Sequence, residues 1–285
     1  MTNYPKNQST NSKVSQHKLS TQLIVIIFAI LIGFPFVFMV STSLKSFEEV
    51  FTVPLSLFPS ELRWDNYVRV WEIVPFAQFT INSLIYTLSI TIGEFILGAA
   101  TAFAFAKLHF PGKKYLFFLV LIPFMIPGEI TLVPRFILLS KLGWINTYAG
   151  LIVPELASTF TTFMLHEHFK SLSDEIFDAA KVDGAGVFRQ LWQIALPMSK
   201  PIVSSLLLLA FVAHWNAYLW PLVVTNSENM RTLPIGIQQI RSGLELPEWQ
   251  LVMAGTTLVV IPLVILFIIA QKQFLEGATQ GALKG

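Results

Sequence analysis

Long apolar runs constrain the fold of this chain more than any other feature of its sequence. The first of them, residues 22–43, contains no charged side chain, and a helix of about 20 such residues is long enough to cross the hydrocarbon core of a membrane. Five more runs follow it, so that the six lie at residues 22–43, 80–106, 115–139, 148–169, 202–225 and 250–269. The pattern predicts an all-α integral membrane protein with six transmembrane helices.

The composition supports a membrane protein and excludes several kinds of chemistry. Hydrophobic residues make up 54% of the chain and charged residues 13%, whereas soluble domains carry roughly 25% charged residues. The net charge of +2 gives no reason to expect a nucleic-acid partner. Since there is no cysteine, disulfides, thiolate metal sites and cysteine nucleophiles are excluded.

The apolar runs divide the chain into three regions. Residues 1–20 are polar and lack apolar periodicity, so we expect a disordered cytoplasmic N-terminus. Residues 21–272 should form the transmembrane domain, which contains a polar loop at residues 171–200, and residues 273–285 should form a cytoplasmic tail. The run at 22–43 is too long for the apolar region of a signal peptide and lacks a cleavage site in the usual place, so it should remain as the first span.

The distribution of lysine and arginine predicts the orientation of the chain. With a cytoplasmic N-terminus, twelve basic residues fall in the inner segments and six in the outer ones, while Arg135 lies within the third run. An excess of positive charge marks the cytoplasmic side. Both termini and the loop at 171–200 are therefore expected in the cytoplasm.

One polar stretch between apolar runs, the 174–197 segment, reads as a helix, a glycine turn and a second helix. Ser173 is a candidate N-cap, and Asp174 and Glu175 suit the positive end of a helix dipole. Gly184 is expected to end the first helix in a left-handed conformation, and Gly186 to allow a sharp reversal. The second helix should place Phe188, Leu191, Trp192 and Ala195 on one face and stop at Pro197. An alternative is an amphipathic loop that lies on lipid headgroups.

The spacing within the 174–197 segment resembles the "EAA" signature of binding-protein-dependent ABC importer permeases. The matching residues are Asp178-Ala179-Ala180, Gly184 and Ile194-x-Leu196-Pro197, with Asp178 in place of the usual glutamate. The resemblance implies that this segment docks into a cytoplasmic ATPase. It assigns an ATPase-coupling role to Asp178, Ala179, Ala180, Asp183, Gly184, Ile194, Leu196 and Pro197.

Other parts of the chain resemble the carbohydrate-type, MalG-like subgroup of these permeases. The similar elements are Trp215-Asn216 with Trp220-Pro221, Thr42 to Lys45, Leu142 to Thr147, Thr232 to Gly236, Gln271 to Gly277 and the terminal Lys284-Gly285. Aromatic side chains stack on the apolar faces of sugar rings and an amide can hydrogen-bond sugar hydroxyls, so Trp215 and Asn216 are candidates for the substrate pathway. The resemblance implies that Gly277, Gly281 and Lys284 reach the ATPases. An aromatic belt at the membrane interface is the alternative for the tryptophans, and it explains Trp220 and Pro221 well.

Two acidic residues within the apolar runs are candidates for the substrate pathway. Glu94 begins a stripe of small residues, Gly98, Ala102 and Ala106, that should face another helix. It could instead lock helix packing. Glu129 follows Pro127-Gly128, where a break in the helix frees backbone groups that must be buried or line a cavity. Its alternative is a simple kink in which Glu129 pairs with Arg135 or another helix.

The sequence offers no enzyme site. No phosphate-binding loop of the Gly-x-x-x-x-Gly-Lys-Ser/Thr kind occurs, so ATP and Mg²⁺ would be bound by a partner ATPase. His166 and His168 point to different sides of a helix and cannot share one metal ion, so no cofactor is expected in this chain.

Together these features predict the permease of an ATP-driven sugar importer in the bacterial cytoplasmic membrane. The resemblance implies a second, similar permease, two cytoplasmic ATPase domains and an extracytoplasmic sugar-binding protein as partners. An importer for an amino acid or peptide is the main alternative. An ion-coupled carrier would need more intramembrane charges and an internal repeat.

Overall fold

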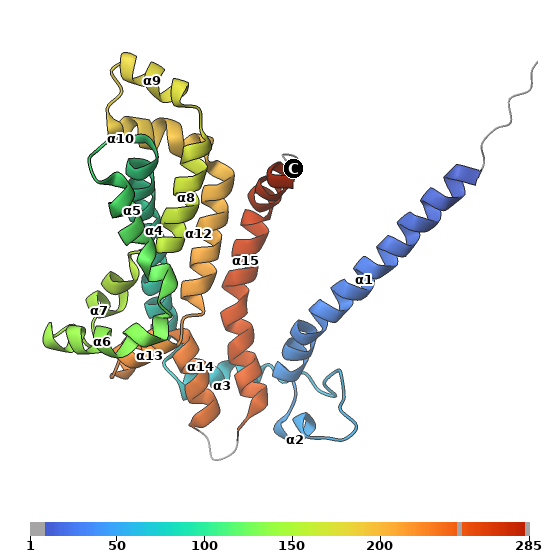
Figure 1. Ribbon diagram of the computed structural model, residues 1–285. Coiled ribbons are helices and arrows are strands. Elements are labelled where there is room, and N and C mark those ends of the chain that lie inside the picture. The colour runs from blue at the N-terminus through green and yellow to red at the C-terminus, as the bar shows by residue number, and fades with distance from the viewer. Residues whose placement is uncertain (1–8, 244–246, 283–285) are drawn as a thin grey trace, which may run out of the picture. The chain divides into compact units, whose positions relative to one another are not determined.

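The computed structural model describes residues 9–243 and 247–282, with side chains described between residues 21 and 271 outside the same gap. Every regular element in these ranges is a helix, in agreement with the all-α prediction (Figure 1). The chain forms two compact units: residues 1–70 with 246–257, and residues 71–245 with 258–285. Each unit is described on its own.

The first unit contains α1 (Ser9–Ser43), α2 (Phe47–Val50), most of α3 (Asp65–Ile73) and the start of α15 (Trp249–Ala282). Polar contacts hold the end of α1: the Asn66 amide donates to the carbonyls of Ser43 and Lys45, both at 2.9 Å. The Arg69 guanidinium pairs with Glu248 at 3.0 Å. Between residues 21 and 40 no side chain of α1 is buried, as expected of a helix that faces lipid or another protein. α1 starts at Ser9, inside the region for which disorder is expected, and residues 1–8 lie outside the described residues.

Three helices form the centre of the second unit: α4 (Phe76–Lys107), α8 (Thr159–Ser171) and α12 (Lys200–Trp215). α4 packs most extensively against α8, then against α12. The predicted small-residue stripe makes this possible, because Gly98 and Ala102 are buried and a Cβ atom on Gly98 would lie 3.1 Å from the Thr161 methyl group. The prediction that this stripe faces protein is confirmed.

Shorter helices surround this centre. They are α5 (Lys113–Leu121), η1 (Ile122–Met125), α6 (Gly128–Lys141), α7 (Tyr148–Ile152), η2 (Val153–Glu155), α9 (Asp174–Val182), α10 (Val187–Gln190), η3 (Leu191–Ala195), α11 (Leu196–Met198), α13 (Leu219–Val224), η4 (Glu228–Met230) and α14 (Leu233–Ser242). Within the second unit, α9 and α10 lie at one end of the long helices and α13 and α14 at the other (Figure 1).

Not all of the predicted spans are straight, uninterrupted helices. Three described helices are long and apolar enough to cross a membrane, Thr21–Ser43, Phe76–Lys107 and Trp249–Gln271. Two further candidates are bent pairs, Lys113–Met125 with Gly128–Lys141 at 101°, and Val187–Met198 with Lys200–Trp215 at 88°. By length and composition the described residues thus supply three spans, or up to five.

The interruptions have local causes. Ile126 precedes Pro127 and is extended, which is the conformation that a following proline favours, so the run at 115–139 breaks there. The run at 148–169 is divided between η2 and α8, where the Ser158 hydroxyl caps the new helix. The run at 202–225 ends its first helix at Trp215 and resumes only as the short α13.

Candidate functional site

The first helix of the 174–197 segment is α9, and its start differs in one detail from the prediction. Ser173 occupies the N-cap position with an extended backbone, but its side chain makes no capping hydrogen bond. Asp174 and Glu175 lie in the first turn as expected. Lys107 of α4 instead donates a hydrogen bond to Asp174 and fixes this end of α9.

Gly184 ends α9 in the predicted left-handed conformation, with φ of +79°. The Ala185 amide donates to the carbonyl of Ala180 at 2.8 Å and the Gly184 amide to that of Lys181 at 3.0 Å. These two bonds are the Schellman arrangement, which satisfies the last carbonyls of a helix. The prediction for Gly184 is confirmed. Gly186 is different, because its φ of −66° is available to any residue; the reversal depends on Gly184 alone.

The second half of the segment is a helix with a wider turn in its middle. α10 leads into the π-helical η3 and then into α11, and the chain bends by 88° between α11 and α12. Pro197 lies one residue before Met198, where this helix ends and the chain bends, so the prediction that the second helix stops at Pro197 is confirmed. Leu191 and Ala195 are buried while Phe188 and Trp192 are exposed, so the single predicted face is divided in two.

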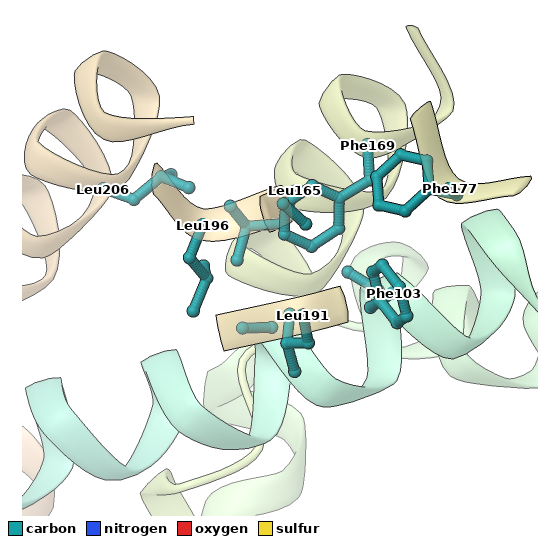
Figure 2. Close-up of a cluster of buried hydrophobic side chains, with 10 residues drawn as sticks. Phe103, Leu165, Phe169, Phe177, Leu191, Leu196 and Leu206 are labelled. Atoms are coloured by element: carbon teal, nitrogen blue, oxygen red, sulfur yellow. The ribbon is translucent and has the colours of Figure 1, made fainter. Parts of the chain in front are cut away.

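A cluster of buried apolar side chains anchors the 174–197 segment to the long helices of its unit. Phe177 of α9 meets Phe103 of α4 with ring centroids 5.8 Å apart, and Phe103 meets Phe169 of α8 at 6.0 Å (Figure 2). Leu191 and Leu196 complete the cluster from the second half of the segment. Burial of one such aromatic side chain contributes about 2 kcal/mol, so the segment is held as part of the bundle rather than lying loosely beside it.

Lys107 provides a polar connection at the same place. Its ammonium group donates to the Leu172 carbonyl at 2.7 Å and to Asp174 Oδ1 at 2.6 Å, and it lies 4.8 Å from the centre of the Phe177 ring. The Lys107 side chain is 5% exposed, whereas that of Asp174 is 82% exposed. The hydrogen bond and the charge of Lys107 lower the pKa of Asp174. The end of α4 is thereby tied to the first residue of α9.

The residues assigned to ATPase coupling fall into two groups. Ala180 and Leu196 are buried, and Ile194 is half-buried against the same apolar cluster. Asp178, Ala179, Asp183, Gly184 and Pro197 are exposed. The exposed group is accompanied by Val182, which is 89% exposed, and Phe188, which is 77% exposed. Large apolar side chains that remain uncovered beside acidic ones are typical of a surface that another protein covers.

Glu94 lies inside the helix bundle. Its carboxylate accepts a hydrogen bond from the Thr161 hydroxyl at 3.0 Å and lies 2.9 Å from His214 Nε2. Glu94 therefore connects α4, α8 and α12, and it is buried. This arrangement is the one expected of a residue that locks helix packing, and a role in substrate contact stays a prediction.

Glu129 and Arg135 do not pair with each other. Glu129 is exposed in the first turn of α6, whereas the Arg135 guanidinium bonds Glu155 and lies 4.0 Å from the centre of the Trp220 ring. The Pro127-Gly128 break thus leaves Glu129 at a surface, and its assignment to the substrate pathway is untested.

The two tryptophans of residues 211–221 are buried. Trp215 donates its indole N–H to the Val259 carbonyl at 3.1 Å and stacks on Phe211, and Trp220 donates to the Leu151 carbonyl at 3.1 Å. The alternative of a membrane-interface belt is therefore wrong for Trp220, since this side chain lies in a helix interface and its N–H is satisfied there. Asn216 is exposed and donates to the Val212 carbonyl at 2.8 Å.

The remaining predicted site residues are only partly described. Gly277 and Gly281 lie within α15, which continues as a helix to Ala282, and Lys284 lies outside the described residues. His166 Nδ1 lies 2.8 Å from Glu167, and the His166 ring packs on Phe117 with centroids 4.1 Å apart. Among the described side chains no group of three or more potential metal ligands gathers.

The fold and the site define a helical membrane protein that presents an anchored helix–turn–helix at one end of a bundle. Comparison with known proteins identifies the class of protein. The family described as "binding-protein-dependent transport system inner membrane component" matches residues 94–277. The chain belongs to this family. Its members are transport permeases, so the predictions of a permease and of a protein that is not an enzyme are confirmed.

Individual relatives extend the match over most of the chain. The sn-glycerol-3-phosphate transport system permease protein UgpE of Yersinia pestis is 33% identical over 90% of this chain and 93% of its own length. UgpE of Brucella abortus (strain 2308) is 31% identical over 90% of this chain and 94% of its own. A solved bacterial ABC transporter involved in the import of the acidic polysaccharide alginate has the same fold, with a TM-score of 0.82, 21% identity and coverage of 95% of this chain and 100% of its own.

Proposed function

We propose that this chain is the permease subunit of an ATP-driven sugar importer in the bacterial cytoplasmic membrane. It crosses the membrane six times, with the bent helices as part of the spans, and both termini and the 174–197 segment lie in the cytoplasm. A second, similar permease, two cytoplasmic ATPase domains and an extracytoplasmic sugar-binding protein complete the importer. ATP and Mg²⁺ are bound by the ATPases.

The division of the 174–197 segment into an anchored face and an exposed face carries this proposal. Phe177, Leu191 and Leu196 join the segment to α4, α8 and α12 through one apolar cluster. Because a packed cluster transmits displacement rather than absorbing it, a partner that moves the exposed face also moves the long helices. That is the mechanical requirement for a permease in which alternating access depends on a separate ATPase.

The exposed face supplies the contact with the ATPase. Asp178 and Asp183 carry its negative charge, and Val182 and Phe188 its apolar surface. The Asp178 carboxylate is 2.8 Å from the Lys181 ammonium, with both side chains largely exposed. A surface pair of this kind is weak, so Asp178 can exchange Lys181 for a group of the partner at little cost.

A sugar is favoured over an amino acid or a peptide as the transported solute. The relatives named above are UgpE, a permease for sn-glycerol-3-phosphate, and the transporter for the polysaccharide alginate. A related solved structure is that of the alginate transporter in complex with an alginate pentasaccharide-bound periplasmic protein, at a TM-score of 0.62 and 15% identity. sn-Glycerol 3-phosphate is a polyol phosphate, so the names of the alginate transporters carry the support for a sugar and for delivery by a binding protein.

Because the chain has no cysteine, single cysteines can test the orientation directly. Val182→Cys should react with a membrane-impermeant maleimide in inside-out vesicles and stay unreactive in intact spheroplasts. Asn226 is exposed between α13 and η4, at the other end of the second unit, so Asn226→Cys should show the reverse. Reaction of Val182→Cys from outside would contradict the proposal.

Proteoliposomes that contain the whole importer should take up sugar only when ATP is present on the side that the 174–197 segment faces. An ion gradient alone should drive no uptake.

A further inference from the structure

A pocket of about 500 Å³ lies in the second unit, at the end opposite the 174–197 segment. Its walls come from the end of α3, from Tyr218 and Leu222 beside and within α13, from the η4 region and from α14. A volume of this size falls within the range of small-molecule sites. If the 174–197 segment is cytoplasmic, this pocket belongs to the outer half of the protein, where a binding protein would release its sugar.

α14 is built to hold one face against the bundle and leave the other open. Leu233 and Ile240 are buried, and Gly236 is so close to the Phe79 ring that a side chain there would collide with it. The Leu233 amide donates to the Ser83 hydroxyl at 2.8 Å. The opposite face has the helical spacing i, i+3, i+4, i+7 and lines the pocket with Ile235, Gln238, Gln239 and Ser242. Ile235 is buried at its base, whereas Gln238 and Ser242 are exposed.

Asn82 fixes the segment that brings charge to the pocket. It is fully buried, and its amide donates to the carbonyls of Asn229 and Arg231, both at 2.8 Å. The Asn82 carbonyl in turn receives bonds from Gln78 at 2.9 Å and Tyr148 at 2.7 Å. The backbone between Glu228 and Arg231 is thus held from α4, so that the two charged residues are positioned before any ligand arrives.

Most polar side chains of the pocket lack partners, whereas the Ser242 hydroxyl donates to the Gln238 backbone carbonyl at 2.9 Å. Among the described residues, the side chains of Tyr218, Glu228, Arg231 and Gln238 form no hydrogen bond or ion pair, and Gln239 Oε1 is buried with no donor. A buried acceptor that stays unsatisfied costs about 1–3 kcal/mol, and such groups call for a partner. The pocket therefore contains positioned donors and acceptors beside the apolar surfaces of Val74, Leu222 and the Tyr218 ring.

We propose that this pocket is a binding subsite for a neutral sugar on the outer side of the permease. A sugar has both hydroxyl groups, which match the two glutamine amides and the charged pair, and apolar ring faces, which match Tyr218. Glu228 and Arg231 together add no net charge, so the pocket offers a phosphate or carboxylate no net electrostatic attraction to offset the cost of desolvating its charge. The subsite rests on the proposed function and narrows its substrate to uncharged sugars.

The test uses the whole importer, purified with its ATPases and permease partner but without the binding protein. Equilibrium binding of radiolabelled maltose, cellobiose and sucrose should show saturable binding of at least one of them. Binding should weaken at least tenfold in Tyr218→Ala and Gln239→Leu, and Asn226→Ala, at the same end but outside the pocket, should leave it unchanged. sn-Glycerol 3-phosphate should bind at least tenfold more weakly than the best neutral sugar.

A second readout avoids variants that fail to assemble. Ser242→Cys places a thiol on the pocket wall of a chain that has no other cysteine. The neutral disaccharide should slow its reaction with a maleimide at least threefold, and should not slow the reaction of Asn226→Cys. Absence of binding by all three sugars, preference for sn-glycerol 3-phosphate, or equal labelling with and without sugar would overturn the subsite. If proteoliposomes made from the same importer and supplied with the binding protein show normal ATP-driven uptake, only the subsite fails; if their uptake does not depend on ATP, the proposed function fails with it.

Discussion

Lys107, the last residue of α4, donates a 2.6 Å hydrogen bond to Asp174, the first residue of α9. The two residues join the longest helix of the second unit to the segment that we propose meets the ATPase. The lysine is buried and the aspartate exposed, so the bond lies where the interior of the bundle ends and the docking surface begins. Its position implies that displacement of α9 pulls directly on α4.

Replacement of Lys107 should separate ATP hydrolysis from transport. Lys107→Met keeps the length of the side chain but removes the bonds to Asp174 and to the Leu172 carbonyl. We expect sugar uptake per ATP hydrolysed to fall several-fold in proteoliposomes, with the importer still assembled. Lys107→Arg retains the charge and should recover part of the ratio. An unchanged ratio in Lys107→Met would show that the bond has no part in coupling.

The pKa of Asp174 predicts the pH range in which this bond acts. Because Lys107 lowers the pKa of Asp174 in the folded protein, the stability it contributes is present above the ordinary aspartate pKa of about 3.9 and is lost as pH falls through the lower folded value. Protease resistance of the 174–197 segment should therefore differ between the natural chain and Asp174→Asn at pH 7. The difference should shrink as pH falls below the ordinary aspartate pKa, and a difference that first appears on acidification would contradict the assignment.

Gly184 should be sensitive to substitution because of its backbone rather than its surroundings. Its φ is +79°, and a Cβ atom there would meet nothing within 4 Å. The left-handed conformation costs an ordinary residue about 1–2 kcal/mol, and a bulky side chain also obstructs the exposed face. Gly184→Val should abolish stimulation of the ATPase while membrane insertion stays normal. Gly184→Asn, which tolerates this conformation, should retain much of the stimulation.

Substitution of Glu94, which contacts His214 and Thr161, distinguishes a role in helix packing from a role in substrate contact. Glu94→Ala leaves His214 and Thr161 without their partner inside the bundle, and a buried polar group left without its hydrogen bond costs about 1–3 kcal/mol. Glu94→Gln keeps an acceptor for Thr161 and should cost less. Thermal unfolding of the purified importer measures the difference. If Glu94 only locks packing, the sugar preference of both variants should match that of the natural chain, whereas an altered preference would place Glu94 in the substrate pathway.

Local sequence signals predicted the parts of this structure that depend on neighbouring residues. Gly184 ends α9 as expected because a left-handed cap is a local requirement, and the stripe of Gly98 and Ala102 faces α8 because small residues permit close approach. The run at 22–43 forms a continuous helix as expected of a span, even though Pro35 lies inside it. The sequence also predicts the break at Pro127-Gly128, because a proline is a local signal. It gives no sign of the interruption after Trp215 and presents residues 202–225 as one span.

The features of the structure that the sequence did not predict are contacts between residues that lie far apart in the chain. Lys107 was informative only as a positive charge at a helix end, since its partner lies 67 residues away, and His214 gave no sign that it would meet Glu94 across 120 residues. The sequence presented Trp220 as a residue of the membrane–water interface, since nothing near it in the chain indicates that its indole N–H bonds the distant Leu151 carbonyl. One usable signal was present: a lone lysine at the end of an apolar helix, followed much later by an acidic helix start.

Uphill uptake of sugar with and without the ATPase subunit tests the central claim most directly. Proteoliposomes that contain the permease pair, loaded binding protein and ATPase should accumulate sugar above the external concentration when ATP is supplied. Those that lack only the ATPase should accumulate none, under either a proton or a sodium gradient. Accumulation without the ATPase would contradict the account, because the 174–197 segment would then have no work to transmit.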